Sequence, residues 1–108
     1  MSTALHPTKA PLKVVVCDVD PACLVAVSGE LDLASAPELA RMLHPLERPG
    51  AVVTLDLQNL SFMDLAGVRA LLDARRVASA AGSSLHIVSP GDGAARVLEL
   101  TGTLDLVE

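Results

Sequence analysis

The chain has 108 residues, 51% of them apolar, and a formal net charge of −5 at pH 7. This is the length of one domain, which can bury about two-thirds of its unfolded surface in a single core. The negative charge, the single Phe and the lack of Trp and Tyr argue against a nucleic-acid partner, which would favour basic patches and stacking aromatics.

The apolar segments are short, and residues 22–27 form one of the longest. Crossing a bilayer takes about 20 consecutive apolar residues, so no membrane insertion is expected. The N-terminus shows no basic segment followed by an apolar run and a cleavage site, so we expect a cytoplasmic protein. Residues 1–11 have two prolines and no periodicity, which predicts a loosely ordered lead-in to a single domain over residues 1–108.

Two runs rich in β-branched residues open the domain. Residues 12–18 and 23–28 flank Asp20-Pro21 at hairpin distance, which predicts two antiparallel strands. Cys17 and Cys23 lie one in each run, without the spacing of a zinc or thioredoxin motif. We expect two buried reduced thiols. A disulfide between the neighbouring strands is the alternative.

A helix is predicted to begin at Ser35. Ser35 and Glu38 have the spacing of a capping box, and Pro49-Gly50 ends the helical pattern. Its apolar positions recur at helical spacing: Ala36, Leu39, Ala40, Leu43 and Leu46. Residues 51–56 then form a short, mostly apolar run, as in a central strand covered on both faces. Residues 57–63 are predicted to be a loop.

Asp64 is predicted to cap a second helix that runs to about Ala80. The helical spacing turns one set of its side chains toward the sheet, namely Val68, Leu71, Leu72 and Ala78. The charged side chains point outward, and Arg69 and Asp73 are spaced as an i, i+4 ion pair. Gly82 ends this helix.

The remaining segments complete an alternating pattern. Residues 84–88 predict a strand, residues 94–100 a third helix, and residues 103–107 a last edge strand. The expected order is β-β-α-β-α-β-α-β. It implies an α/β fold with a mixed sheet, antiparallel in the opening hairpin and parallel in the centre, and about three to four packed helices.

Four segments in register resemble one family, the STAS domains of bacterial anti-sigma factor antagonists, also called anti-anti-sigma factors. Residues 28–39 (SGELDLASAPEL) resemble the family's Gly-Glu-Leu-Asp segment and first helix. Residues 55–64 and 67–72 resemble its central strand, loop and second helix, and residues 96–102 its last helix. The resemblance implies a STAS fold and a protein that binds an anti-sigma factor, in some cases a kinase, to release a sigma factor.

One position departs from the family pattern. In typical members the second helix opens with Asp-Ser-Ser-Gly or Asp-Ser-Thr-Gly, and a partner kinase phosphorylates the hydroxyl after the Asp. Residues 64–67 here read Asp-Leu-Ala-Gly. Leu65 has no hydroxyl, so the usual phosphate of about −1.5 to −2 charges cannot be added there. The protein is then a constitutive antagonist, or its partner is no longer a serine kinase.

The resemblance places partner binding at the start of the first helix and the tip of the second. Glu30 and Asp32 are expected to form an acidic contact patch, and Asp64 to serve both as cap and as part of the rim. Leu65 is expected to present apolar surface near solvent. The full set of expected contact residues is Glu30, Asp32, Ser35, Asp64, Leu65, Ala66, Gly67 and Arg69.

Other candidate sites have simpler interpretations. Ser61, the nearest remaining hydroxyl, is expected to satisfy local backbone groups. Gly91 and Gly93 are expected to form a turn and cap, because no phosphate-binding motif follows them. The histidines are scattered without metal-ligand spacing: His6, His44 and His86. No catalytic constellation can be assembled, so we expect neither an enzyme nor a cofactor or metal site.

Two further functions stay open at this point. One is a STAS subunit that docks on a transporter ATPase or a signalling scaffold. The other is a nucleotide-binding sensor, since STAS domains as a group are sometimes linked to nucleotides. Pairing of two copies into a homodimer through an exposed edge strand is also left open.

Overall fold

The computed structural model describes residues 10–108. Most of the predicted lead-in, and His6 within it, therefore lies outside the described residues. Of the lead-in, Ala10 is held against the sheet, because its carbonyl accepts a hydrogen bond of 3.2 Å from the Glu30 amide.

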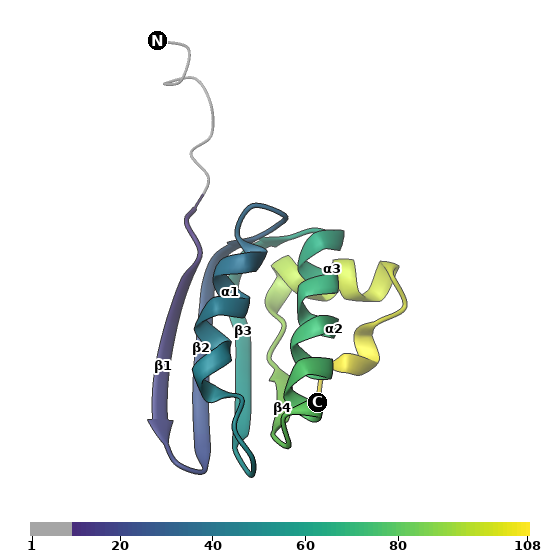
Figure 1. The fold of residues 1–108 in the computed structure, drawn as a ribbon. Coiled ribbons are helices and arrows are strands. Elements are labelled where there is room, and N and C mark those ends of the chain that lie inside the picture. Colours follow the sequence, from purple (N-terminus) through teal and green to yellow (C-terminus); the bar gives the residue numbers. More distant parts are fainter. Residues whose placement is uncertain (1–9) are drawn as a thin grey trace.

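In residues 10–108, four strands form one sheet in the order β1-β2-β3-β4 (Figure 1). β1 (Lys13–Val19) and β2 (Ala22–Leu31) form the predicted antiparallel hairpin. β3 (Val52–Met63) pairs parallel with β2, and β4 (Ser84–Val88) pairs parallel with β3. The mixed sheet expected from the sequence is confirmed, and β3 has the predicted interior place.

Within the described residues, three α-helices accompany the sheet: α1 (Ala36–Leu43), α2 (Leu65–Ala80) and α3 (Gly91–Leu100). In Figure 1, α1 and α2 lie side by side across one face of the sheet, with α3 next to α2. A single cluster of buried apolar side chains joins these helices to the sheet. The longest helix, α2, has 16 residues, and no helix within residues 10–108 is long and apolar enough to span a bilayer.

The helices α1 and α2 cover one face only. Along β2, Cys23, Val25 and Val27 are buried, whereas Leu24 between them is 50% exposed. β3 alternates in the same way, with Val53 buried and Val52 42% exposed. The crossovers β2-α1-β3 and β3-α2-β4 advance in one direction, and right-handed crossovers in one direction place both helices on one side. The expectation that the central strand is covered on both faces is therefore wrong.

Several predicted boundaries also change. The predicted loop 57–63 is strand, because β3 keeps pairing with β2 through two register shifts. The α-helix α1 stops at Leu43 and continues as a 3-10 turn, η2 (His44–Leu46), because Pro45 has no N–H to bond back along an α-helix. The predicted last strand is mostly a 3-10 turn, η3 (Leu104–Leu106), followed by a single bridge from Val107 to Ile87.

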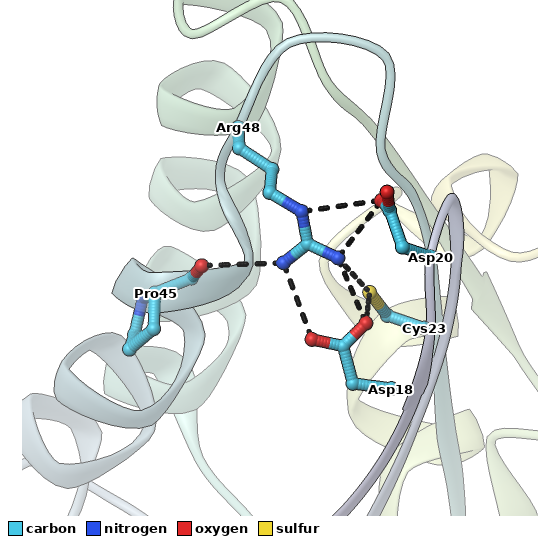
Figure 2. Close-up of polar contacts among 5 residues, drawn as sticks. All are labelled: Asp18, Asp20, Cys23, Pro45 and Arg48. Carbon is cyan, nitrogen blue, oxygen red and sulfur yellow. Dashed lines mark hydrogen bonds and ion pairs between the residues drawn. The ribbon is translucent and has the colours of Figure 1, made fainter.

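Arg48 ties the tip of the β1–β2 hairpin to the chain segment after α1 (Figure 2). Its guanidinium donates hydrogen bonds to Asp18 at 2.8 Å and to Asp20 at 3.0 Å. The hydrogen bond from Arg48, followed by that from Cys23, holds the pKa of Asp18 below its usual value. Burial, followed by the hydrogen bond to Asp18, raises the pKa of the Cys23 thiol. At neutral pH the thiol therefore stays protonated and donates to Asp18 at 3.2 Å.

The two cysteines lie on opposite faces of the sheet. Cys23 is buried, as expected, but Cys17 is exposed. In the hairpin register Cys17 pairs with Leu24 and Asp18 with Cys23, so the two thiols occupy adjacent rows whose side chains alternate. Both cysteines are free. A disulfide between them would require the hairpin to change register.

The Arg48 cluster predicts a specific dependence of stability on pH. Because the folded pKa of Asp18 is lowered, its stabilisation is complete above its unfolded pKa, about 4, and is lost as the pH falls through its folded pKa. We expect Arg48→Met to lower the melting temperature at pH 7, and this deficit to shrink in strong acid. Thermal melts of both proteins across pH measure it. Arg76→Met, which breaks an exposed pair within α2, is the control, and an equal deficit there would contradict a special role for Arg48.

Candidate functional site

The junctions that lead into α1 and α2 lie at the same end of the sheet, where β2 and β3 finish. β2 and β3 are parallel, and Leu31 at the end of β2 pairs with Met63 at the end of β3. Parallel strands finish at the same end, so the turn before α1 and the start of α2 become neighbours (Figure 1). The structure thus brings together two segments that the sequence separates by about thirty residues.

Asp32 and Ser35 build the turn before α1. The Asp32 carboxylate accepts a hydrogen bond from the Ser35 amide at 3.0 Å, and the Ser35 hydroxyl lies 2.8 Å from the Glu30 carbonyl, to which it donates. Asp32 is only 7% exposed. The predicted acidic contact patch is therefore not formed at Asp32, whose polar atoms serve the turn.

The predicted capping box is absent. Ser35 makes no side-chain cap, and its φ of −97° and ψ of −15° lie in the helical region rather than the extended region that a capping residue adopts. Glu38 pairs instead with Arg41 at 2.6 Å. The hydroxyl of Ser35 is already used by the preceding turn, which leaves it unavailable for the helix amides.

Glu30 belongs to a different part of the surface. It precedes the fully buried Leu31, which points to the core side, so alternation turns Glu30 toward the face away from α1 and α2. The Ala10 amide donates a hydrogen bond of 3.3 Å to its carboxylate. Glu30 therefore holds the chain before β1 and does not join the residues at the tip of α2.

Asp64 caps α2, as predicted. Its backbone is extended, with φ −115° and ψ −169°, and its carboxylate accepts a hydrogen bond from the Gly67 amide at 3.1 Å. Gly67 is buried against the sheet rather than offered to a partner. A Cβ atom on Gly67 would lie 2.7 Å from the Leu31 carbonyl oxygen and 2.4 Å from Met63 Cγ, so this glycine lets α2 approach the strands closely.

Leu65 is 68% exposed at the first position of α2, as the sequence analysis expects. Leu33, in the turn before α1, is 79% exposed at the same end of the sheet. We call these two side chains the apolar tip. Sequence reasoning missed Leu33 because it appeared as part of a continuous family segment. Leu33 could have been found from its position, because it is an apolar residue in the short turn between the end of a strand and the start of a helix.

A groove of about 430 Å³ lies between α1 and α2, next to the apolar tip. Alanines on both helices leave this space because their side chains are too small to fill it. Its lining includes Leu33, Ala36, Ala40, Ala66, Ala70 and Val77. Leu33 of the apolar tip lines this groove, and Ala66, the residue after Leu65, lines it from α2.

Arg69 lies on the wall of this groove and is exposed. The predicted ion pair with Asp73 does not form, because Asp73 pairs with Arg76 at 3.1 Å. Within residues 10–108, Arg69 makes no hydrogen bond or ion pair. Its guanidinium is therefore free to meet an anionic group at the border of an apolar surface.

The other candidate positions have structural roles. Ser61 lies in β3 rather than in a loop, and its hydroxyl donates to the Gly29 carbonyl of β2 at 3.1 Å, so it satisfies the backbone of the neighbouring strand rather than local groups. Gly91 and Gly93 do not form the predicted turn, because both lie in the first turn of α3, which begins at Gly91 rather than at residue 94. Cβ atoms on them would lie 2.6 Å and 2.5 Å from carbonyl oxygens of β3, so these glycines let α3 approach that strand closely. His44 and His86 each lie near a glutamate, and among residues 10–108 no group of His, Cys, Asp and Glu is placed to hold a metal ion.

Known proteins share both the sequence and the fold. Residues 13–108 match the STAS domain. An anti-sigma-B factor antagonist from Staphylococcus aureus is 32% identical over 84 residues, which cover 77% of this chain and 78% of that protein.

Two solved structures are similar over most of their length. An anti-sigma factor antagonist from Mycobacterium paratuberculosis superposes with a TM-score of 0.75 at 25% identity, covering 93% of this chain and 87% of that one. The unphosphorylated form of the anti-sigma factor antagonist SpoIIAA superposes with a TM-score of 0.72 at 20% identity, covering 89% and 86%. With the mixed sheet, the three helices and the match across residues 13–108, the chain belongs to the STAS domain family, as these anti-sigma factor antagonists do.

Proposed function

We propose that this protein is an anti-sigma factor antagonist, which binds an anti-sigma factor in the bacterial cytoplasm and thereby releases a sigma factor. The relatives that carry this name support the class of function. The observation that carries the proposal within this chain is the apolar tip, because Leu33 and Leu65 are 79% and 68% exposed side chains at the junctions before α1 and α2. Apolar surface of this kind is typical of a protein interface.

The binding surface consists of the apolar tip, the groove and Arg69. Burying Leu33 and Leu65 against a partner would remove apolar area from water. The groove between α1 and α2 would accommodate apolar side chains of the same partner. Arg69 would face an acidic group, which orients the partner. Asp64 keeps its role as helix cap, and Gly67 and Asp32 support the surface from beneath.

The same surface is not switched by phosphorylation at position 65. A phosphate at the first position of α2 would bring about −1.5 to −2 charges to an apolar interface. Leu65 has no oxygen to carry it. Binding at this surface is therefore constitutive with respect to a kinase, and any control acts through the amount of either protein or through another site.

Titration calorimetry of the full chain with purified anti-sigma factors from the same genome tests this function. We expect saturable binding to one of them, and release of its sigma factor in a competition experiment. If that factor is a kinase, labelled ATP should mark a Leu65→Ser variant and leave the wild-type chain unlabelled. Failure to bind any anti-sigma factor, together with binding to a transporter ATPase or to a nucleotide, would overturn the proposal.

A further inference from the structure

The two edge strands of the sheet, β1 and β4, differ in whether another segment pairs with their outer side. At the β4 edge, Val107 forms a bridge with Ile87, and the Glu108 amide donates a hydrogen bond of 2.8 Å to the Ile87 carbonyl. At the other edge, β1 pairs with β2 on its inner side only. No segment within residues 10–108 pairs with the outer side of β1.

β1 also lacks two features that often keep an edge strand from pairing, a bulge and a proline. Its register with β2 runs without a bulge from Lys13 to Val19, and the strand contains no proline. Val15 and Val19 are 66% and 68% exposed on the face that α1 and α2 leave uncovered. The exposed Leu24 and Val52 extend this apolar surface onto the next two strands.

The charges along β1 favour a second copy of the same strand. Lys13 begins β1, and the acidic Asp18 and Asp20 lie at its end, where the latter side chain is 74% exposed. Arg48 offsets only one of these two carboxylates, so the end of the hairpin keeps a net negative charge. In an antiparallel pair of two β1 strands, Lys13 of each copy lies toward the end of the other strand, where Asp20 is exposed.

We propose that the outer edge of β1 pairs antiparallel with β1 of a second copy, so that the two sheets join about a two-fold axis near Val16. In this register Val15 of each copy lies beside Cys17 of the other, on the uncovered face. The pairing does not use the apolar tip, because Leu33 and Leu65 lie in the junctions that lead into α1 and α2, whereas β1 pairs through its outer backbone edge. Each dimer would present two copies of the apolar tip.

Sedimentation equilibrium of the full chain in reductant tests this dimer. We expect a reversible monomer–dimer equilibrium for the wild type, and Val15→Lys should raise the dimer dissociation constant at least about tenfold by adding two like charges near the axis. Leu100→Lys, at a 74% exposed site on α3, is the matched control and should leave the constant unchanged. Thermal melts establish that both variants fold.

Hydrogen exchange gives a second measurement, because outward-facing β1 amides should become more protected as the protein concentration rises. A wild-type chain that stays monomeric up to about 1 mM would overturn the proposal. So would a dimer that Val15→Lys leaves intact, since it would use another surface. None of these results depends on whether the partner is an anti-sigma factor.

Discussion

Replacing Leu65 with Asp should weaken binding to the anti-sigma factor by about 30- to 1000-fold, the range for an interface hot spot worth about 2–4 kcal/mol. The substitution removes a side chain that is 68% exposed at the apolar tip and puts a carboxylate there, which must lose its water when the partner binds. The fold should survive. Position 65 begins α2, and a negative charge in the first turn of a helix is favourable.

Two variants make this result specific. Leu65→Met keeps an apolar side chain of similar volume and should bind within about threefold of the wild type. Leu100→Asp changes an exposed leucine on α3 and should leave affinity unchanged. Calorimetric titration measures all three. If Leu65→Asp binds as the wild type does, the tip of α2 is not part of the interface, even if the protein still binds an anti-sigma factor elsewhere.

Gly67→Ala should destabilise the fold by about 1–3 kcal/mol, the usual cost of forcing an extra group into packed surroundings. The added methyl would lie 2.7 Å from the Leu31 carbonyl oxygen, and because this atom belongs to the backbone of β2, α2 itself would have to move. In an unhindered helix the same change stabilises by about 0.5–1 kcal/mol. A loss of stability in Gly67→Ala would therefore support the close approach of α2 to β2, and a gain would contradict it.

Urea denaturation of the wild type and Gly67→Ala, followed by circular dichroism, measures this difference. Ala66→Gly is the neighbouring control, since it changes helix propensity in the first turn without adding atoms near the strands. A variant as stable as the wild type, or more so, would contradict the packing of α2 against β2. A destabilised variant that keeps its partner affinity would show that Gly67 acts on the fold and does not contact the partner.

Most of the fold followed from local patterns. The β-branched hairpin and the cap at Asp64 involve residues near one another in sequence, so short-range periodicity predicts them. The boundaries that failed depend on distant partners. β3 continues past its predicted end at residue 56 because β2 is long enough to keep pairing with it, and the segment after Gly102 has room for one bridge to β4 rather than a strand.

The site was predictable only in part. The family resemblance and the residue at position 65 pointed to the tip of α2, and its exposure is as expected. The family resemblance also places the segment with Glu30 and Asp32 beside this tip, which predicted an acidic contact patch there. Strand alternation turns Glu30 to the other face, and the turn before α1 buries the Asp32 carboxylate in its own hydrogen bonds.

The sequence by itself determined the order of most strands and helices, the cap of α2 and the lack of a hydroxyl at position 65. Only the tertiary structure decided that Leu33 lies at the same end of the sheet as Leu65, and that α1 and α2 leave the other face of the sheet uncovered. It also decided that Arg69, on the wall of the groove, has no ion-pair partner within residues 10–108. The physical reason is that backbone periodicity acts over a few residues. Exposure depends instead on which distant strands pair, in which register, and on which side the crossovers run.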